Sequence, residues 1–268
     1  MISVIKDIDA YKHFLFSLPE LEGDEVYMLI LAARNKYLTP EQKQEFKLGN
    51  SCVLNRQIIK DKIKENSKVL HYIFDDNLYT DVHGRALPEN CYALYITVNP
   101  RSVFKATQSF NTLYDKYIQE YISTYDKATV FKKFSGMYQS FNSEIQNKRG
   151  TVSVSDIDFD VVDKVKGLHY VTDFLSFLAK SRNSLDDNKV TIVETRGGYH
   201  LVIHLTTLTN DVKRGYYNKL QELHARGQAE FGEKFEIFQN KQDMIPVPGS
   251  MQGGFIVRVV DEQTLLTY

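Results

Sequence analysis

Apolar and polar residues alternate with two different periods along the first hundred residues of the chain. Apolar positions that recur every three or four residues predict helices over residues 9–16 and 54–64. Short apolar runs predict strands over residues 25–33 and 91–98. The polar stretch 75–90, which contains Gly84 and Pro88, predicts a long surface loop. We therefore expect a small α/β lobe in this part of the chain.

The pattern changes after Gly150. It predicts strands over residues 151–159, 190–194 and 199–205, helices over about 171–180 and 211–228, and a closing strand over 255–260. Between the two parts, aromatic residues recur at three and four positions over residues 107–125, which predicts a helix with an aromatic stripe in the core. The stripe consists of Phe110, Tyr114, Tyr117, Tyr121 and Tyr125. We expect an α+β fold in one domain, with an N-terminal lobe of about 1–149 and a second lobe of about 150–268 that carries a mixed sheet with helices.

Composition narrows the class of protein. The 33 basic and 34 acidic residues nearly balance, so any nucleic-acid surface must be local. The two cysteines, Cys52 and Cys91, lie far apart, which argues against a zinc module and a disulfide scaffold. No signal-like or membrane-length apolar run is present, so we expect a cytoplasmic protein with no membrane partner.

The segment 101–149 holds eight basic and four acidic residues. A net charge of +4 could favour contact with a nucleic-acid backbone, although such a charge is more often an ordinary solvated face. The candidate nucleic-acid contacts are Arg101, Lys132 and Lys133.

Three carboxylates, Asp156, Asp158 and Asp160, occupy every second position of the predicted strand 151–159 and its end. Because a strand points alternate side chains to one face, the three acids are expected on one side. Oxygen ligands in this arrangement suit Mg²⁺ or Mn²⁺, which bridge to nucleotide phosphates. The alternative is an exposed, acidic strand edge.

A second polar group, Arg196, Gly197, Gly198 and His200, begins the predicted strand 199–205. Glycines allow a backbone to approach a ligand closely, and their amides, with Arg196 and His200, can donate to triphosphate oxygens. His200 and His204 share a strand face, so either is also compatible with a structural role.

The motif Asp156-Ile157-Asp158, followed downstream by Gly198-Tyr199-His200, resembles the first two motifs of the archaeo-eukaryotic primase superfamily, in its primase-polymerase branch. The family patterns are hydrophobic-Asp-hydrophobic-Asp/Glu and small-x-His; here Ser155 replaces the first hydrophobic residue. The third motif is a hydrophobic residue followed by Asp. Asp243, ahead of the turn at 246–250, is the preferred match, and Asp261 is the alternative, although the turn lacks the Arg found in many relatives.

The resemblance implies a two-lobed core whose second lobe is similar to an RNA-recognition-motif sheet. It implies template-dependent nucleotidyl transfer, in which nucleoside triphosphates are joined on a single-stranded DNA template with Mg²⁺ or Mn²⁺. Asp156, Asp158 and Asp243 would be metal ligands, and His200 would act with the two strand carboxylates in catalysis. Arg196, Gly197, Gly198 and His200 would hold the nucleotide.

The chain contains no Walker-type sequence, so replication of a phage or plasmid would need a helicase in trans. Two other functions remain open at this point. Asp-x-Asp also occurs in nucleotide-sugar glycosyltransferases, and the uncertain third acid is compatible with a catalytically silent nucleic-acid-binding protein.

Overall fold

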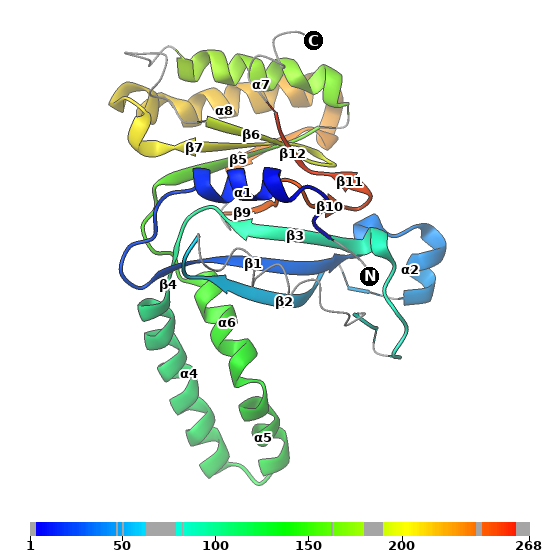
Figure 1. Cartoon of the computed structure of the whole chain (residues 1–268), viewed down its shortest axis with the longest axis vertical. Helices are drawn as coiled ribbons and strands as arrows, with labels where there is room; N and C mark the ends of the chain where they lie inside the picture. The colour runs from blue at the N-terminus through cyan, green and yellow to red at the C-terminus, as the bar shows by residue number, and fades with distance from the viewer. Residues whose placement is uncertain are drawn as a thin grey trace.

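The computed structural model describes residues 4–46, 48–49, 51–62, 79–81, 83–161, 163–179, 190–239 and 243–260. This part of the chain forms a mixed α+β fold with two sheets, and every pairing between its named strands is antiparallel. The predicted α+β class is confirmed, whereas the predicted mixed pairing of the second sheet is wrong. Figure 1 shows the two sheets one above the other, with a helical arm extending below.

The first sheet is built around a long central strand, β1 (Glu25–Arg34). Its other strands are β2 (Ser51–Ile59), β3 (Tyr92–Thr97), β4 (Arg101–Ser102), β9 (Met244–Pro246), β10 (Met251–Gln252) and β11 (Phe255–Ile256). The main path runs β11-β10-β3-β1-β2; β4 also pairs with β1, and β9 with β3. Successive β1 side chains enter two different apolar clusters, so both faces of this strand are buried.

Residues 54–62, the described part of the predicted helix 54–64, are not helical. Residues 51–59 form strand β2, which pairs along nearly the whole of β1 with one irregularity between Leu31 and Ala32. Leu54 and Ile58 lie four positions apart, which matches a helix face, yet each packs here on an apolar cluster of the sheet. The buried backbone of β1 requires hydrogen-bond partners on both sides, and β2 supplies one of them.

The second sheet has the strand order β12-β6-β7-β5-β8. Its strands are β5 (Val154–Asp160), β6 (Val190–Glu194), β7 (Gly198–His204), β8 (Glu236–Gln239) and β12 (Arg258–Val260). Helix α7 (Lys164–Ala179) follows β5, and helix α8 (Asn210–Phe231) follows β7. Ile157, Phe159 and Leu201 form an apolar cluster with these helices, which therefore cover one face of the sheet.

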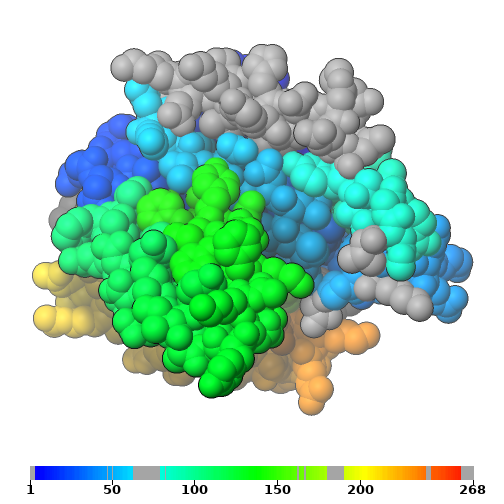
Figure 2. All heavy atoms as spheres, turned by 90° about the horizontal axis from the view of Figure 1, so that it is seen from below, coloured from blue at the N-terminus to red at the C-terminus, as the bar shows by residue number. Residues whose placement is uncertain are grey.

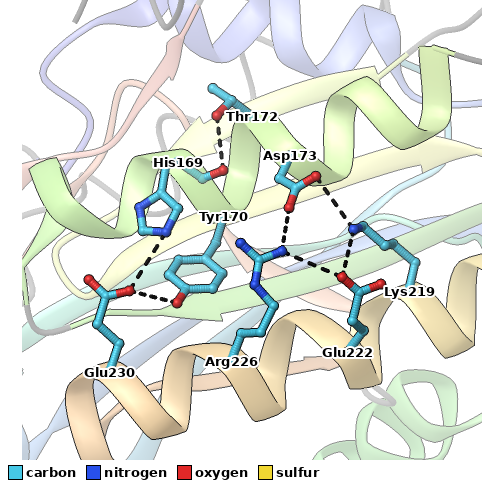
Figure 3. Close-up of polar contacts among 8 residues, drawn as sticks. All are labelled: His169, Tyr170, Thr172, Asp173, Lys219, Glu222, Arg226 and Glu230. Carbon is cyan, nitrogen blue, oxygen red and sulfur yellow. Dashed lines mark hydrogen bonds and ion pairs between the residues drawn. The ribbon is translucent and has the colours of Figure 1, made fainter.

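Polar contacts on the outer side of this layer join α7 to α8 (Figure 3). Arg226 donates to Asp173 at 2.8 Å, and Lys219 lies 3.4 Å from the other oxygen of Asp173. The hydroxyl of Tyr170 donates to Glu230 at 2.8 Å. These contacts fix the register of the two helices, although each exposed ion pair contributes little to stability.

A shared apolar cluster connects the two sheets. It combines β1 and β3 with Val154, Val193 and Val202 of the second sheet, and with helix α1 (Ile8–Ser17). After β8 the chain returns to the first sheet through β9, β10 and β11 before it ends the second sheet with β12. The predicted division near residue 149 therefore fails for residues 244–256, which belong to the first sheet.

The arm consists of α4 (Val103–Ser123), α5 (Lys127–Ser135) and α6 (Met137–Asn147). Figure 2, which views the molecule from below, shows it standing in front of the first sheet. The aromatic stripe of the predicted helix lies inside this arm rather than in the main core. Phe110 packs on Phe141, and Tyr114, Tyr117 and Tyr121 surround Phe134. Tyr125 is fully exposed.

The remaining helical elements are short. They are α2 (Pro40–Phe46) and the 3₁₀ turns η1 (Asn35–Tyr37), η2 (Glu89–Cys91), η3 (Leu205–Thr207) and η4 (Gly232–Lys234). Within the described ranges, no helix combines the length and the apolar character needed to cross a bilayer. The predicted loop 75–90 is described only in part, because residues 75–78 and 82 lie outside those ranges.

Candidate active site

Strands β5 and β7 bring the two sequence motifs together. They pair in antiparallel register, with Asp158 opposite His200 and Asp156 opposite Val202. Directly opposed residues in such a pair share one face of the sheet. Ile157 and Phe159 point to the α7–α8 layer, so the carboxylates and His200 lie on the opposite face of the sheet. Val202 lies on this face too, and it packs against the first sheet.

His200 contacts both carboxylates. Its Nδ1 atom lies 3.0 Å from Oδ1 of Asp156, and its Nε2 atom lies 3.6 Å from Oδ1 of Asp158. Asp156 has no exposed surface, and 17% of the Asp158 side chain is exposed. The imidazole thus bridges a buried carboxylate and a partly accessible one.

Burial and mutual repulsion set the protonation of this group. Burial raises the pKa of Asp158 to about 6, with further increases from Asp160 and Asp156, while His200 and Lys36 act in the opposite direction. Burial by itself lowers the pKa of His200, but Asp156 and Asp158 outweigh it and raise that pKa to about 9. At neutral pH the imidazole of His200 is therefore protonated, and Asp158 is ionised.

The two glycines of the second motif have packing roles. A Cβ atom at Gly198 would lie 1.8 Å from the backbone oxygen of Phe159, so only glycine allows β7 to approach β5 there. The Gly198 amide already donates to Oγ1 of Thr195 at 3.2 Å. A Cβ atom at Gly197 would lie 2.6 Å from Asp160. Strand packing is therefore enough to explain why glycine is required at position 198, whether or not a nucleotide binds there. The contact of both glycines with phosphate stays a prediction.

Arg196 is exposed and lies in the turn between β6 and β7. Its guanidinium carbon is 5.1 Å from the centre of the Tyr37 ring, which η1 supplies from the first sheet. Lys36, in the same turn as Tyr37, acts electrostatically on Asp158. Sequence reasoning missed Lys36 and Tyr37 as members of this site, because their only signal was a short polar run at the end of an apolar strand.

Asp243 is held by two arginines, Arg101 of strand β4 and Arg149 from the segment that follows α6. Its Oδ2 atom lies 2.5 Å from Nε of Arg149 and 4.0 Å from Nη1 of Arg101. Burial raises the pKa of Asp243, although both arginines oppose this. Asp156 also raises that pKa, which places the two carboxylates in the same region. The alternative third acid, Asp261, lies outside the described residues.

The candidate nucleic-acid contacts occupy different environments. Only 2% of the Arg101 side chain is exposed, so its interior contact with Asp243 replaces the predicted surface role. Lys133 lies in the arm and pairs with Glu120 at 2.5 Å. Lys132 is exposed on α5 and makes no ion pair within the described part of the chain. Lys132 and Lys133 remain candidates for contact with nucleic acid.

The carboxylates suit one mode of divalent metal binding. Among the described residues, no group of three or more His, Cys, Asp and Glu side chains has the arrangement of a metal site. Mg²⁺, however, is commonly bound through one or two carboxylates and completes its octahedron with phosphate oxygens and water. Asp156 and Asp158, which share a face and repel each other, fit that donor set.

Comparison of the chain with protein-family models, with curated proteins and with solved structures found no match.

Proposed function

We propose that this protein is a template-dependent nucleotidyltransferase, a primase or primase-polymerase that joins nucleoside triphosphates on single-stranded DNA. The observation that carries this proposal is the convergence of Asp156, Asp158 and His200 on one face of paired strands. The order β5-α7-β6-β7-α8-β8 also supports it, because a β-α-β-β-α-β unit is the order expected of an RNA-recognition-motif-like lobe.

The carboxylates supply the negative charge of the reaction site. Asp158, with a pKa of about 6, is ionised at neutral pH, and Asp156 is held in place by His200. Asp156 and Asp158 would hold a divalent ion, which would lower the pKa of the attacking 3′-hydroxyl and neutralise charge that develops on the α-phosphate. The bond from the 3′-oxygen to the α-phosphorus would form as the bond to pyrophosphate breaks, and pyrophosphate would leave.

His200 has two tasks in this proposal. Its Nδ1–H donates to Asp156 and fixes the orientation of the ring. Its Nε2–H lies on the side of Asp158 and, because the ring is protonated, can donate to a phosphate oxygen of the incoming nucleotide. Arg196 is available from the neighbouring turn as a second donor.

The test is a primer-extension and priming assay on single-stranded DNA with Mg²⁺ or Mn²⁺ and labelled nucleotides. We expect metal-dependent products from the wild type and none from Asp158→Asn, which keeps the shape of the side chain. Asp211→Asn, on the exposed first turn of α8, is the matched control and should retain full activity. Equal product from Asp158→Asn and wild type would refute the assignment, and products without a primer would identify a primase.

A catalytically silent nucleic-acid-binding protein is the second candidate function. The observation in its favour is the pairing of Asp243 with Arg149 and Arg101, since both cations compete with a metal ion for this carboxylate. Retained binding of single-stranded DNA, with no nucleotide incorporation under any metal condition, would support this function over catalysis.

A further inference from the structure

Three cations gather at the place where the two sheets meet beside Asp158. Arg34 ends β1, and Lys36 lies in the η1 turn that follows. Arg196 comes from the β6–β7 turn of the other sheet. Tyr37 connects all three, because each of the two arginines and Lys36 acts on its ring or its phenol group. The cluster therefore contains residues from both sheets.

Tyr37 is a rigid platform for two of these cations. Its side chain is buried, with 6% of the residue exposed. The guanidinium carbon of Arg196 lies 5.1 Å from the ring centre and Nζ of Lys36 lies 5.5 Å from it. Arg34 lies over the neighbouring ring of Tyr95, at 5.7 Å. Aromatic faces attract cations but leave their charge and their N–H donors available.

Tyr37 and Arg196 also pack against β10 and the β10–β11 turn. The backbone amide of Arg196 donates to Oε1 of Gln252 at 2.8 Å. Gly253 has a φ of +59°, and a Cβ atom there would lie 2.4 Å from Nη1 of Arg196 and 2.7 Å from the Tyr37 ring. Close packing therefore determines where the guanidinium lies.

Lys36 acts on Asp158 through space, but the three cations are not paired with carboxylates at salt-bridge distance in the part of the chain that the structure describes. Among the described residues, neither Arg34 nor Lys36 nor Arg196 forms an ion pair, and the buried Nε of Arg34 has no hydrogen-bond acceptor. Other basic residues of the second sheet are neutralised: Lys164 and Arg258 both contact Glu194. An unpaired, partly buried guanidinium is costly, so the cluster is suited to an external anion.

We propose that Arg34, Lys36 and Arg196 form a polyphosphate-binding subsite shared by the two sheets. Three cations would offset most of the negative charge of a triphosphate, and guanidinium groups recognise phosphate oxygens with paired donors. The identification of the anion as a nucleoside triphosphate rests on the proposed function, since the cluster lies beside Asp158. Occupation of the subsite joins the β1–η1 corner to the β6–β7 turn.

The experiment measures binding of inorganic tripolyphosphate by calorimetry, in EDTA and without DNA, at two salt concentrations. Lys36→Ala and Arg196→Ala should each weaken binding by about tenfold, the effect of losing one charge-assisted contact. Both side chains are exposed, so the variants should fold, which circular dichroism checks. Lys43→Ala, an exposed lysine of α2, is the matched control and should bind like wild type.

The subsite would be overturned if the wild type did not bind tripolyphosphate, or if the wild type and Lys36→Ala bound it equally. Loss of affinity for a single-stranded oligonucleotide alone, with tripolyphosphate binding intact, would also overturn it and assign the cations to the nucleic-acid backbone. The proposed function is judged separately. Tripolyphosphate binding that depends on Lys36, in a protein that never incorporates nucleotides, would support the subsite and reject polymerase activity. Nucleotide incorporation that is unaffected by Lys36→Ala would support polymerase activity and reject the subsite.

Discussion

Nδ1 of His200 lies 3.0 Å from Oδ1 of Asp156, across the β5–β7 ladder. Both residues are buried, so the charge of each is stabilised by the other rather than by water. Asp156 therefore has two proposed roles. It is a candidate metal ligand, and it contributes more than Asp158 to the raised pKa of His200. The protonation state of the whole site depends on this contact.

Replacement of Asp156 by Asn should lower the pKa of His200 from about 9 toward or below its ordinary value of 6.5, because burial then opposes protonation with less compensation. The raised pKa contributes stability that is fully present below pH 6.5 and lost as pH rises through about 9. An NMR titration of the imidazole in the metal-free protein measures the shift. A His200 that still titrates near pH 9 in Asp156→Asn, as in the control Asp211→Asn, would contradict this account.

Asp158→Asn should stabilise the metal-free protein while abolishing nucleotide transfer. The folded pKa of Asp158, about 6, exceeds the ordinary value of 3.8, so the contribution of this group to stability is present below pH 3.8 and is lost as pH rises through 6. At pH 8 the substitution should therefore raise the free energy of unfolding by up to about 3 kcal/mol, and by less at pH 5. Denaturant unfolding at both pH values checks the sign; lower stability at pH 8 would show that the ionised carboxylate is favourable.

Gly198→Ala should disrupt the pairing of β5 with β7, since the new methyl group collides with the backbone oxygen of Phe159. Backbone cannot move aside as a flexible side chain does, so we expect a loss of about 3 kcal/mol or more in unfolding free energy. Gly136→Ala is the control, because the nearest atom to its Cβ is 3.7 Å away and its φ is −91°. Similar melting temperatures for the two variants would show that the strands can separate at little cost.

Asp243→Asn distinguishes a structural role from a metal-binding role. The substitution removes a carboxylate whose burial is unfavourable, as its raised pKa shows, but it also leaves Arg101, 2% exposed, without its buried anion. We expect the second effect to dominate, because an uncompensated buried guanidinium is strongly destabilising, with a net cost of about 2–4 kcal/mol in chemical unfolding. Asn tolerates the positive φ of +50° at this position, so backbone strain does not confuse the result. Glu144→Gln, which breaks the more exposed pair with Lys148, should cost under about 1 kcal/mol. Unchanged stability with complete loss of metal-dependent transfer would instead make Asp243 a ligand.

Lys132→Ala should weaken binding of single-stranded DNA and reduce the slope of log affinity against log salt by about 1, the result expected when one phosphate contact is removed. Lys133→Ala should have a smaller effect, because Lys133 already pairs with Glu120. Fluorescence anisotropy at several salt concentrations measures both. Equal slopes for wild type and Lys132→Ala would remove α5 from the nucleic-acid surface.

The two motif strands were predictable because their pattern is local. Alternation of apolar and acidic residues at 156–160 places all the carboxylates on one face of the strand. The other motif strand was predicted over residues 199–205 and is observed as Gly198–His204. The partner of His200 was not predictable, since register between β5 and β7 depends on the Gly198 approach and on the helices behind the sheet.

The failed predictions share a physical cause. Residues 54–58 carry helix spacing but pair with β1, and the stripe from Phe110 to Tyr121 has core composition but packs within the arm. Arg101 was placed on a basic surface and is buried beside Asp243. In each case residues far away in the sequence decide the environment, and local propensity is overridden by tertiary contacts.

The sequence by itself determined the α+β class, most strands and helices, and the presence of carboxylates and a histidine in strand contexts, because these depend on periods of two and 3.6 residues. Only the tertiary structure decided which of the functional side chains lie close to one another. It placed His200 between Asp156 and Asp158, gave Asp243 to two arginines, and brought Lys36 to the same site from the other sheet. The reason is that side-chain environment is set by long-range packing and burial, which no local pattern encodes.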